Sequence, residues 1–591
     1  MSDPSVVHNS QAESNASIRA ARPWIQSYQP GVPAQLEIPD QPLTWLLDEA
    51  VRQYPHHTAL IYYGTKMSYA QLAAQADRFA HALVGLGIQK GDRVAIALPN
   101  IPQYPIAFYA ALKAGAVVVP TNPLYTAREM QHQLADAGAR LLIMLDMFYP
   151  VVRAVRESAG LQLVIVTSPA DFLPPVLRLL YPLSQRGTKH PGPPLTTREL
   201  YSDANLHSMK ALLGAQMSTG QLPAPASSTE LAVLQYTGGT TGLSKGAMLT
   251  HRNLLANALQ TRHWTPEAAQ GGEATLCVAP FFHSYGLTVG MNLSLVAGAT
   301  MILLPKFTAR EVVRTIVRYR PTMFPGIPTM YVAIMREAKG RTSLFRSVRF
   351  CISGAAPLPA QVQKDFEQLS GGKLVEGYGL SETSPVTHCN PLDEHCVNGS
   401  VGLPLPEIDA MIMDNETGKR LPAGEIGEIM VKGPNVMQGY WHREAETRAI
   451  FHDGWMHTGD LGYMDEKGYF YIADRSKDLI VASGFNVYPR EVEEVLYRHD
   501  AVQEAAVVGV PDAYRGENVV AVIVLKSQII ASDETRASIV EHCKKELAAY
   551  KVPKVIEFRQ DLPKSLIGKI LRREVRQLLA EPAPGEREQA T

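Results

Sequence analysis

The sequence predicts an α/β protein, with a large N-terminal domain of mixed α/β sheets followed by a small C-terminal α+β domain. Residues 93–119 alternate strand, helix and strand, a rhythm typical of parallel strand pairing. Toward the C-terminus, helices expected at residues 489–499 and 535–550 accompany strand-like runs at 502–510 and 519–525. This second pattern is that of a compact domain of its own.

The composition is ordinary for a folded enzyme. The chain has 591 residues, of which 46% are hydrophobic and 19% charged, and its formal net charge is -1. That charge balance argues against a general nucleic-acid binder. The five cysteines contain no Cys-x-x-Cys pair, which fits a reducing compartment and no zinc site. We therefore expect a cytoplasmic protein with flexible tails at residues 1–30 and 581–591.

The beginning of the large domain alternates helices and strands. An apolar spacing predicts a helix at residues 42–54, and a second helix begins at Ser68, a residue typical of N-caps. A buried strand at residues 93–98, a helix at 104–114 and a strand at 116–119 follow. The order of these elements favours a sheet with parallel pairings.

A glycine-rich loop at residues 236–246 reads as a phosphate-binding loop. Its four glycines let successive backbone N–H groups converge on one anion, while three threonine hydroxyls and Lys245 add donors and a positive charge. It is not a Walker loop, because Lys245 follows Ser244 and no Ser or Thr comes after it. The alternative interpretation is a mobile turn between a strand at residues 231–235 and a helix at 252–260.

Two segments raise the question of membrane contact. Residues 286–304 carry no charge, but their glycines and polar side chains suit a buried helix followed by a strand better than lipid. Residues 171–194 are rich in proline, leucine and basic residues. They are interpreted either as a surface loop that touches a bilayer or as a loop packed on its own domain, and the sequence favours neither.

Later segments place small residues at expected strand ends, where backbone can approach a flat ring closely. These segments are residues 325–331, 353–358 and 376–383. A different feature is the basic bias of residues 542–577, which hold ten Lys or Arg against four Asp or Glu. Such a bias could attract the phosphates of a substrate, or it could be a solvated face.

The order and spacing of these motifs resemble the adenylate-forming superfamily of acyl-CoA synthetases, peptide-synthetase adenylation domains and luciferases. The resemblance covers residues 42–576, and the wording of residues 484–489, 550–554 and 568–573 looks like bacterial long-chain fatty acyl-CoA synthetases. Family members often have proline at the position of Ser244 and Ser or Thr at that of Ile567. Neither departure removes the anion site or the lysine that follows.

The resemblance implies a site for ATP and AMP. Tyr378 would stack on adenine, Thr383 would lie by the α-phosphate, and Asp460 and Arg475 would contact the ribose. Glu382 would bind Mg²⁺, a cation that prefers oxygen ligands beside substrate phosphates, with Thr237 as a further ligand. The residues assigned to ATP or AMP are Thr237, Gly238, Gly239, Thr240, Thr241, Gly242, Lys245, Gly354, Ala355, Ala356, Gly377, Tyr378, Gly379, Thr383, Asp460 and Arg475.

The resemblance also implies a domain boundary and a mobile small domain. A large domain at residues 31–474 would bind ATP and the acyl group, and a small domain at 475–580 would rotate about Lys477. The residues assigned to catalysis are Lys569, Glu382, His283 and Thr237. His283 is assigned as a residue that lines the site, and proton transfer is not assigned to it. The residues assigned to a coenzyme A tunnel are His283, Ser483, Gly484 and Phe485.

The implied reaction joins a long-chain fatty acid to coenzyme A through an acyl-adenylate, with Mg²⁺ as cofactor and AMP and pyrophosphate as products. Three alternatives stay open. They are a fatty acyl-AMP ligase that feeds a carrier protein, a medium-chain or aryl-CoA ligase, and a non-catalytic fatty-acid binder. Peripheral contact with the inner face of the membrane and a homodimer are compatible with the sequence, which leaves acyl chain length and oligomeric state undetermined.

Overall fold

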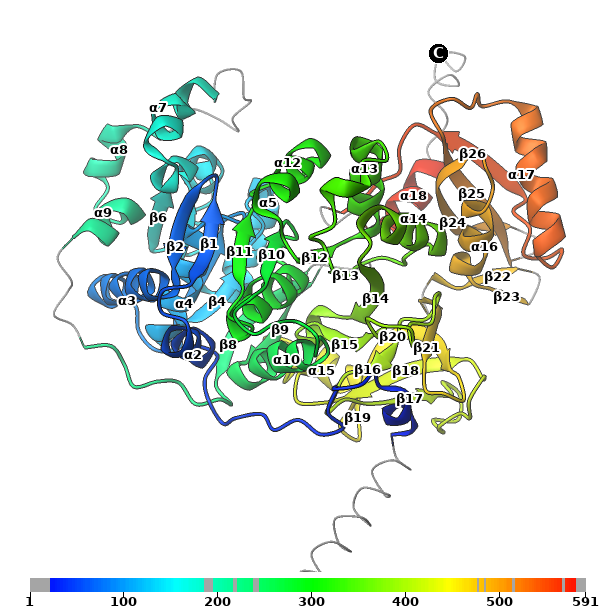
Figure 1. The fold of residues 1–591 in the computed structure, drawn as a ribbon, viewed down its shortest axis with the longest axis horizontal. Helices are drawn as coiled ribbons and strands as arrows, with labels where there is room; N and C mark the ends of the chain where they lie inside the picture. The colour runs from blue at the N-terminus through cyan, green and yellow to red at the C-terminus, as the bar shows by residue number, and fades with distance from the viewer. Residues whose placement is uncertain are drawn as a thin grey trace, which may run out of the picture.

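Four sheets and their covering helices make up the fold in this computed structural model (Figure 1). The first two sheets lie side by side in the blue-to-green part, the third lies below them, and the fourth forms the orange-to-red unit at one end. The α/β fold class is confirmed. The structure describes residues 22–184, 195–215, 221–237, 244–475, 478–482, 485–512, 516–565 and 569–580.

The first sheet has seven strands in the order β7-β6-β5-β3-β4-β8-β9. The predicted parallel pairing of the strands at residues 93–98 and 116–119 is confirmed, because β3 and β4 pair in parallel. Its strands are β3 (Arg93–Ala97), β4 (Val117–Pro120), β5 (Ala139–Leu145), β6 (Leu163–Thr167), β7 (Leu206–Ser208), β8 (Leu231–Thr237) and β9 (Lys245–Thr250). The helices from this part of the chain are α2 (Trp45–Gln53), α3 (Tyr69–Gly85), α4 (Gln103–Lys113), α5 (Ala127–Ala137), α6 (Tyr149–Arg153), α7 (Pro175–Ser184), α8 (Thr197–Ser202) and α9 (Met209–Gly214).

Local signals explain where these helices begin. Ser68 caps α3 as expected: its hydroxyl accepts from the Gln71 backbone N–H, and the Gln71 side chain accepts from the Ser68 N–H. The apolar face of α3 is fully buried, including Leu72, Phe79 and Leu83. The helix therefore packs on the core through the residues whose spacing predicted it.

The second sheet has nine strands in the order β16-β15-β14-β13-β12-β10-β11-β1-β2, and its central strands pair in parallel. Its strands are β1 (Thr58–Tyr62), β2 (Thr65–Ser68), β10 (Ala274–Cys277), β11 (Thr300–Leu303), β12 (Met323–Gly326), β13 (Phe350–Ser353), β14 (Lys373–Gly379), β15 (Val386–Cys389) and β16 (Leu403–Pro404). The helices from this part of the chain are α10 (His251–His263), a π-helix (Gly286–Asn292), α11 (Leu293–Val296), α12 (Ala309–Tyr319), α13 (Pro328–Ala338) and α14 (Ala360–Ser370).

The uncharged segment at residues 286–304 is a buried helical region followed by a strand, as expected. The π-helix and α11 are almost completely enclosed, and β11 follows them in the sheet. Among the helices that the structure describes, none combines the length and the apolar character needed to cross a bilayer.

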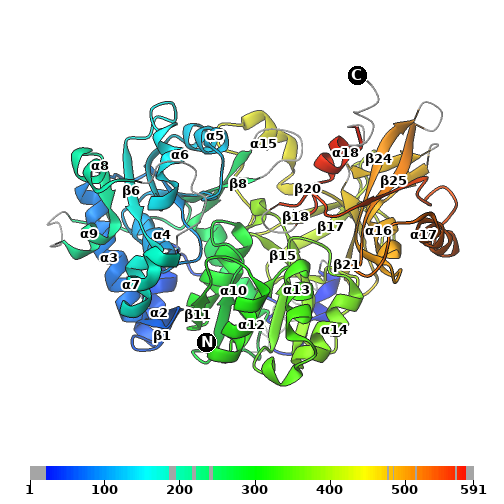
Figure 2. The ribbon, with the colours of Figure 1, turned by 90° about the horizontal axis from the view of Figure 1, so that it is seen from above.

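The third and fourth sheets each have five strands. The third contains β17 (Asp409–Met413), β18 (Gly427–Lys432), β19 (Phe451–His452), β20 (Trp455–Met464) and β21 (Phe470–Arg475), with α15 (Glu444–Ile450) beside it. The fourth contains β22 (Ile480–Ala482), β23 (Phe485–Val487), β24 (Val502–Asp512), β25 (Gly516–Leu525) and β26 (Val555–Arg559). We call the fourth sheet, with α16 (Pro489–Tyr497), α17 (Asp533–Glu546) and α18 (Arg572–Ala580), the small domain, and the preceding three sheets with their helices the large domain. Figure 2 shows the small domain at one end, seen from above.

Two local expectations were wrong. The glycine-rich loop does not join a strand to a helix: β9 follows it and pairs antiparallel with β8, because the chain turns back at the loop before α10 begins. Residues 175–184 are not a loop but helix α7, since Pro175 has the backbone angle of a first helical turn and leucine favours helix. The predicted segment continues to residue 194, and residues 185–194 lie outside the described chain.

A buried carboxyl group lies between the two domains. Glu376 of β14 is 6% exposed, and its Oε1 lies 3.6 Å from Nη2 of Arg490 on α16. Its Oε2 accepts from the Leu358 backbone N–H at 3.3 Å. Burial raises the pKa of Glu376 from the ordinary 4.5 to about 7, although the charge of Arg490 acts in the opposite direction. This carboxyl group thus titrates near neutral pH at the domain interface.

We predict that Glu376→Gln changes the pH dependence of stability. The folded protein keeps the Glu376 proton up to about pH 7, whereas the unfolded chain loses it near 4.5. The folded state therefore binds more protons in this window, and the stability from this group is lost as the pH rises through it. Relative to wild type, the variant should become more stable as the pH rises from about 5 to about 8, measured as the free energy of unfolding in denaturant. Exposed Glu416→Gln is the control, and parallel curves for wild type and Glu376→Gln would contradict the assignment.

Candidate active site

The two strands that flank the glycine-rich loop hold its ends together. Thr237 closes β8, Lys245 opens β9, and the two residues are direct partners in the antiparallel ladder. The turn at Ser381–Thr383, which carries Glu382, contacts both strands. The structure therefore brings Thr237, Lys245 and Glu382 into one neighbourhood. The other predicted loop residues, Gly238, Gly239, Thr240, Thr241 and Gly242, lie outside the described chain.

A tyrosine joins the predicted lysine to the predicted metal ligand. The ammonium group of Lys245 lies 5.3 Å from the centre of the Tyr440 ring, and the Tyr440 hydroxyl donates to Oε1 of Glu382 at 2.8 Å. Lys245 also forms an ion pair with Glu446 of α15. Burial, with the nearby charge of Glu382, raises the pKa of Tyr440 far above its ordinary value, so the hydroxyl keeps its proton. No motif in the sequence marks Tyr440 or Glu446; a β-bridge between Ala247 and Tyr440 brings this segment to the site.

The oxygen atoms at this place fit a magnesium ion. Glu382 offers a carboxylate and Thr237 a hydroxyl, and Mg²⁺ takes oxygen ligands, including one or two carboxylates, together with substrate phosphates. The Tyr440 hydroxyl holds one oxygen of Glu382 in a defined direction. That support is of the kind that orients a metal-binding carboxylate.

The predicted adenine and ribose residues meet across two sheets. Tyr378 lies in β14, Asp460 lies in β20, and the Tyr378 hydroxyl donates to Oδ2 of Asp460 at 2.7 Å. Asp460 is 3% exposed, and its backbone pairs with that of Arg475 on β21. The structure thus brings the three predicted residues together, although the side chain of Arg475 is not among the described groups.

The predicted small-residue segments lie at the ends of adjacent parallel strands β13 and β14. Gly354 is followed by Ala355, whose backbone has a positive φ of 66°, and by Ala356. A Cβ on Gly354 would lie 2.9 Å from the Tyr285 ring. Gly377 and Gly379 end β14, and a Cβ on Gly379 would lie 1.8 Å from the Pro385 carbonyl oxygen. These two positions are therefore constrained by contacts within the protein itself, besides any contact with a ligand.

Thr383 has a structural role in addition to the one predicted for it. Its side chain is buried, and its hydroxyl lies within donating distance of the carbonyl groups of Leu380 and Pro385. The same hydroxyl accepts from the Leu380 backbone N–H. If the Thr383 hydroxyl donated to an α-phosphate, it would give up its hydrogen bond to one of these carbonyl groups, which stabilises the turn at Ser381–Thr383.

The predicted catalytic lysine of the small domain reaches the large domain. The Lys569 backbone carbonyl accepts from the Ser565 backbone N–H at 2.8 Å. Desolvation, with a smaller contribution from the charge of Lys569, lowers the pKa of His283 to about 4. Nδ1 of His283 accepts from the Tyr285 backbone N–H at 3.3 Å. His283 is thus a neutral group at neutral pH, and Lys569 supplies the positive charge beside it.

The predicted coenzyme A tunnel is described only in part. Phe485 lies in β23 and is 55% exposed, with its ring stacked on that of Tyr550 at a centroid distance of 4.7 Å. Ser483 and Gly484, like the predicted hinge Lys477, lie outside the described residues. The tunnel and the hinge therefore stay predictions.

Comparisons with known proteins identify the family of the chain. A family model described as AMP-binding enzyme matches residues 47–441, and one described as AMP-binding enzyme C-terminal domain matches residues 491–569. The chain is 45% identical to the long-chain-fatty-acid–CoA ligase of Bacillus subtilis (strain 168), covering 94% of this chain and 98% of that protein. It is 38% identical to the enzyme of the same name in Salmonella typhimurium, covering 94% and 97%.

Two solved structures have the same fold as this chain. ATP-bound MatB from Rhodopseudomonas palustris matches with a TM-score of 0.80 at 32% identity, covering 92% of this chain and 99% of that one. The anthranilate CoA ligase AuaEII in complex with anthranoyl-AMP matches with a TM-score of 0.81 at 28% identity, covering 92% and 98%. The chain therefore belongs to the AMP-binding enzyme family, the adenylate-forming proteins that its motifs resemble.

Proposed function

We propose that the protein activates a long-chain fatty acid with ATP and transfers the acyl group to coenzyme A, giving acyl-CoA, AMP and pyrophosphate. The observation that carries this proposal is that the charge of Lys569, in the small domain, acts on His283 of the large domain. His283 precedes Ser284, whose hydroxyl lies 3.3 Å from that of Ser381, the residue before Glu382. The names of the most similar relatives support long-chain fatty acids as the substrate class.

The first half-reaction brings two anions together. The fatty carboxylate attacks the α-phosphorus of ATP, an acyl-adenylate forms, and pyrophosphate leaves. Lys569 and Lys245 place positive charges where negative charge develops, and the loop between β8 and β9 adds backbone N–H donors. A magnesium ion held by Glu382 and Thr237 would supply further charge neutralisation. Tyr378 and Asp460 hold adenine and ribose, so that binding energy of the nucleotide positions the reacting phosphate.

In the second half-reaction, the coenzyme A thiol attacks the mixed anhydride and AMP leaves. We propose that the small domain, residues 475–580, rotates about Lys477 against the large domain, residues 31–474. That motion would withdraw Lys569 and bring the segment with Ser483, Gly484 and Phe485 to His283. His283 then lines the tunnel as a neutral group, because its pKa of about 4 leaves it uncharged at the pH of the cytoplasm.

The function is tested by supplying purified protein with ATP, Mg²⁺ and fatty acids of increasing length, with and without coenzyme A. We expect AMP and acyl-CoA to form together, with the highest kcat/KM for long chains. Acyl-adenylate that accumulates with or without coenzyme A would indicate a fatty acyl-AMP ligase. A maximum at short or aromatic acids would reassign the substrate, and no turnover with any acid would indicate a binder.

Glu446 competes with ATP for Lys245 in this proposal. The side chains of Lys245 and Glu446 form an ion pair and are 36% and 40% exposed. Solvent therefore weakens the pair, and phosphates can displace Glu446 from Lys245. We predict that Glu446→Gln lowers the KM for ATP by less than about threefold and leaves kcat unchanged. Steady-state kinetics at fixed fatty acid and coenzyme A measure both values. Glu444→Gln on the same helix is the control, and a higher KM in the Glu446 variant would contradict the prediction.

We also propose that the protein contacts an anionic membrane through α7 and α12. Val176, Leu179 and Leu183 of α7 are 69%, 79% and 52% exposed. Cationic side chains face solvent on the neighbouring helix α12 at a spacing of four residues, namely Arg310, Arg314 and Arg318. The turn at Gly64 links the two helices, since a Cβ there would lie 3.7 Å from the Arg318 guanidinium and 3.8 Å from Pro174. Apolar side chains beside cations are the combination that binds an anionic bilayer surface.

Vesicle binding tests this membrane face. Wild type should sediment with vesicles that contain phosphatidylglycerol more than with pure phosphatidylcholine vesicles, and salt should weaken the binding. The double substitution Val176→Ser and Leu179→Ser should reduce binding without changing activity on a soluble acyl substrate. Ile530→Ser, at an apolar side chain that is 81% exposed in the small domain, should bind like wild type. Equal binding by all three proteins would exclude this face. Sedimentation equilibrium without lipid tests whether the protein is a homodimer, which the sequence leaves open.

A further inference from the structure

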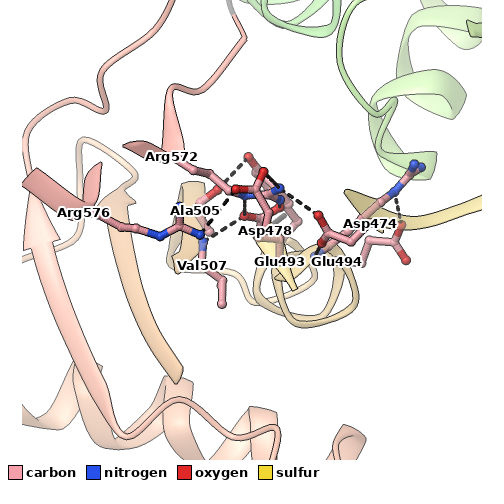
Figure 3. Close-up of polar contacts among 10 residues, drawn as sticks. Asp474, Asp478, Glu493, Glu494, Ala505, Val507, Arg572 and Arg576 are labelled. Atoms are coloured by element: carbon pink, nitrogen blue, oxygen red, sulfur yellow. Dashed lines mark hydrogen bonds and ion pairs between the residues drawn. The ribbon is translucent and has the colours of Figure 1, made fainter. Parts of the chain in front are cut away.

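An arginine at the start of α18 joins three carboxylates (Figure 3). Nη1 of Arg572 lies 2.9 Å from Oδ1 of Asp474 and 3.4 Å from Oδ2 of Asp478, and Nη2 lies 2.7 Å from Oε2 of Glu493. The Arg572 side chain is 19% exposed and that of Asp474 is 2% exposed. Burial by itself would lower the pKa of Arg572, but the charges of Glu493 and Asp474 outweigh it and raise this pKa. The group is therefore a paired, desolvated cluster in which the guanidinium stays charged.

The three carboxylates belong to different parts of the molecule. Asp474 lies in β21 and pairs with Leu461 of β20, next to the pair formed by Asp460 and Arg475. It is thus part of the wall that holds the predicted ribose residue. Asp478 and Glu493 lie beyond the expected hinge at Lys477, and Glu493 is on α16 of the small domain. Of the three contacts that Arg572 makes with these carboxylates, only the one with Asp474 therefore joins the two sides of that hinge.

A short stretch of chain transmits this contact to the catalytic lysine. Arg572 comes three residues after Lys569. Between them, Ile570 forms a β-bridge with Lys564, and the Leu571 backbone N–H donates to the Pro563 carbonyl at 2.9 Å. Lys569 is fixed from the other side by the bond between its carbonyl and the Ser565 N–H. A shift of Arg572 would consequently move Lys569 with it.

Asp474 makes a second contact with the small domain. Its Oδ2 accepts from the backbone N–H of Arg490 at 2.7 Å, in the first turn of α16. A carboxylate at a helix N-terminus is favoured by the helix dipole. The two oxygens of one buried side chain thus bind both α16 and α18.

We propose that Asp474 and Arg572 form a positioning latch that holds the small domain in the orientation in which Lys569 reaches His283. The inference rests on the proposed function, because it assumes that rotation about Lys477 separates the two half-reactions. Rotation would change the distance from Asp474 to Arg572 but leave Arg572 with Asp478 and Glu493, which move with it. The latch therefore favours adenylation specifically, and its loss should not impair the orientation used for thioester formation.

The sharpest test is Asp474→Asn. The substitution removes the negative charge but keeps the shape and an oxygen acceptor, while Arg572 retains Glu493 and Asp478 as partners. We expect the kcat of adenylation, measured by exchange of pyrophosphate into ATP, to fall about tenfold to a hundredfold, as for misplacement of a reacting group. The KM for ATP should change little, because Tyr378 and Asp460 are untouched. Thioester formation from supplied acyl-adenylate should be unchanged or faster.

Matched variants identify other causes. Arg576→Gln alters a neighbouring arginine whose contact, at 3.3 Å, is with Asp478 and not across the hinge, so both half-reactions should match wild type. Lys569→Ala should lose adenylation more completely, by roughly two to three orders of magnitude, and spare thioester formation. Arg572→Lys keeps the charge but cannot bridge the carboxylates with one planar group. It should lower the rate of adenylation relative to that of thioester formation as Asp474→Asn does, and it keeps the test valid if Asp474→Asn folds poorly.

The outcomes separate the latch from the proposed function. If wild type forms no acyl-adenylate, the proposed function fails and the latch with it. If wild type and Arg576→Gln carry out both half-reactions, the function stands and the two latch variants decide. An equal loss of both half-reactions in Asp474→Asn and Arg572→Lys would mean a merely structural role. No loss in either variant would also overturn the latch.

Discussion

The ion pair of Arg572 with Asp474 joins the small domain of this ligase to the large one, beside the contacts of Arg490 with Asp474 and Glu376. Tyr378, Thr383 and Asp460, which are assigned to the nucleotide, lie in the large domain, whereas Lys569 lies in the small one. The approach of Lys569 to His283 therefore requires the domains to hold one relative orientation. A buried ion pair suits that task, because it is strong only in one geometry and costs desolvation in any other. Because its strength depends on geometry, the ion pair favours one orientation and still allows the domains to separate.

Electrostatics at the site follow from the removal of water. Desolvation keeps His283 neutral and Tyr440 protonated, and it raises the pKa of Glu376 to about 7 at the domain interface. The charges that stay are those with partners: Lys245 beside Glu446, and Arg572 among its carboxylates. A triphosphate that enters this site meets Lys245, whose counter-ion Glu446 is 40% exposed and can be displaced. The protein is thus arranged to exchange internal ion pairs for contacts with its substrate.

The active site is assembled from all four sheets. The glycine-rich loop joins β8 and β9 of the first sheet, Tyr378 and Glu382 come from the second, Asp460 from the third, and Lys569 follows the fourth. Tyr440 ties the first two together through Lys245 and Glu382, and the bond from Tyr378 to Asp460 ties the second to the third. Each bond crosses between sheets, so the position of any one group depends on how the sheets pack.

The sequence by itself determined the fold class and several local elements, and it predicted which groups carry the chemistry. Apolar periodicity and the Ser68 cap are local signals, and the elements predicted between residues 42 and 119 lie within three residues of the observed bounds. The parallel pairing of β3 with β4 was also predicted from a local signal, because only the short helix α4 separates the two strands along the chain. Motif order indicated Lys245, Glu382, Asp460 and Lys569, because the chemistry needs these residue types.

The tertiary structure alone decided which distant side chains support those groups. Strand β9 was missed because its evidence is the ladder with β8. A loop was expected at α7 from a composition rich in proline, leucine and basic residues, although Pro175 begins a helix there. Tyr440 and Glu446 lie in no motif, and the motifs that contain or adjoin Glu376, Asp474 and Arg572 assigned no role to these three residues. The partners of all five lie elsewhere in the chain. The titration of Glu376 near neutral pH, the ion pair of Lys245 with Glu446 and the contact of Asp474 with Arg572 all depend on the tertiary structure. Each arises only when folding brings the groups together and removes water from between them.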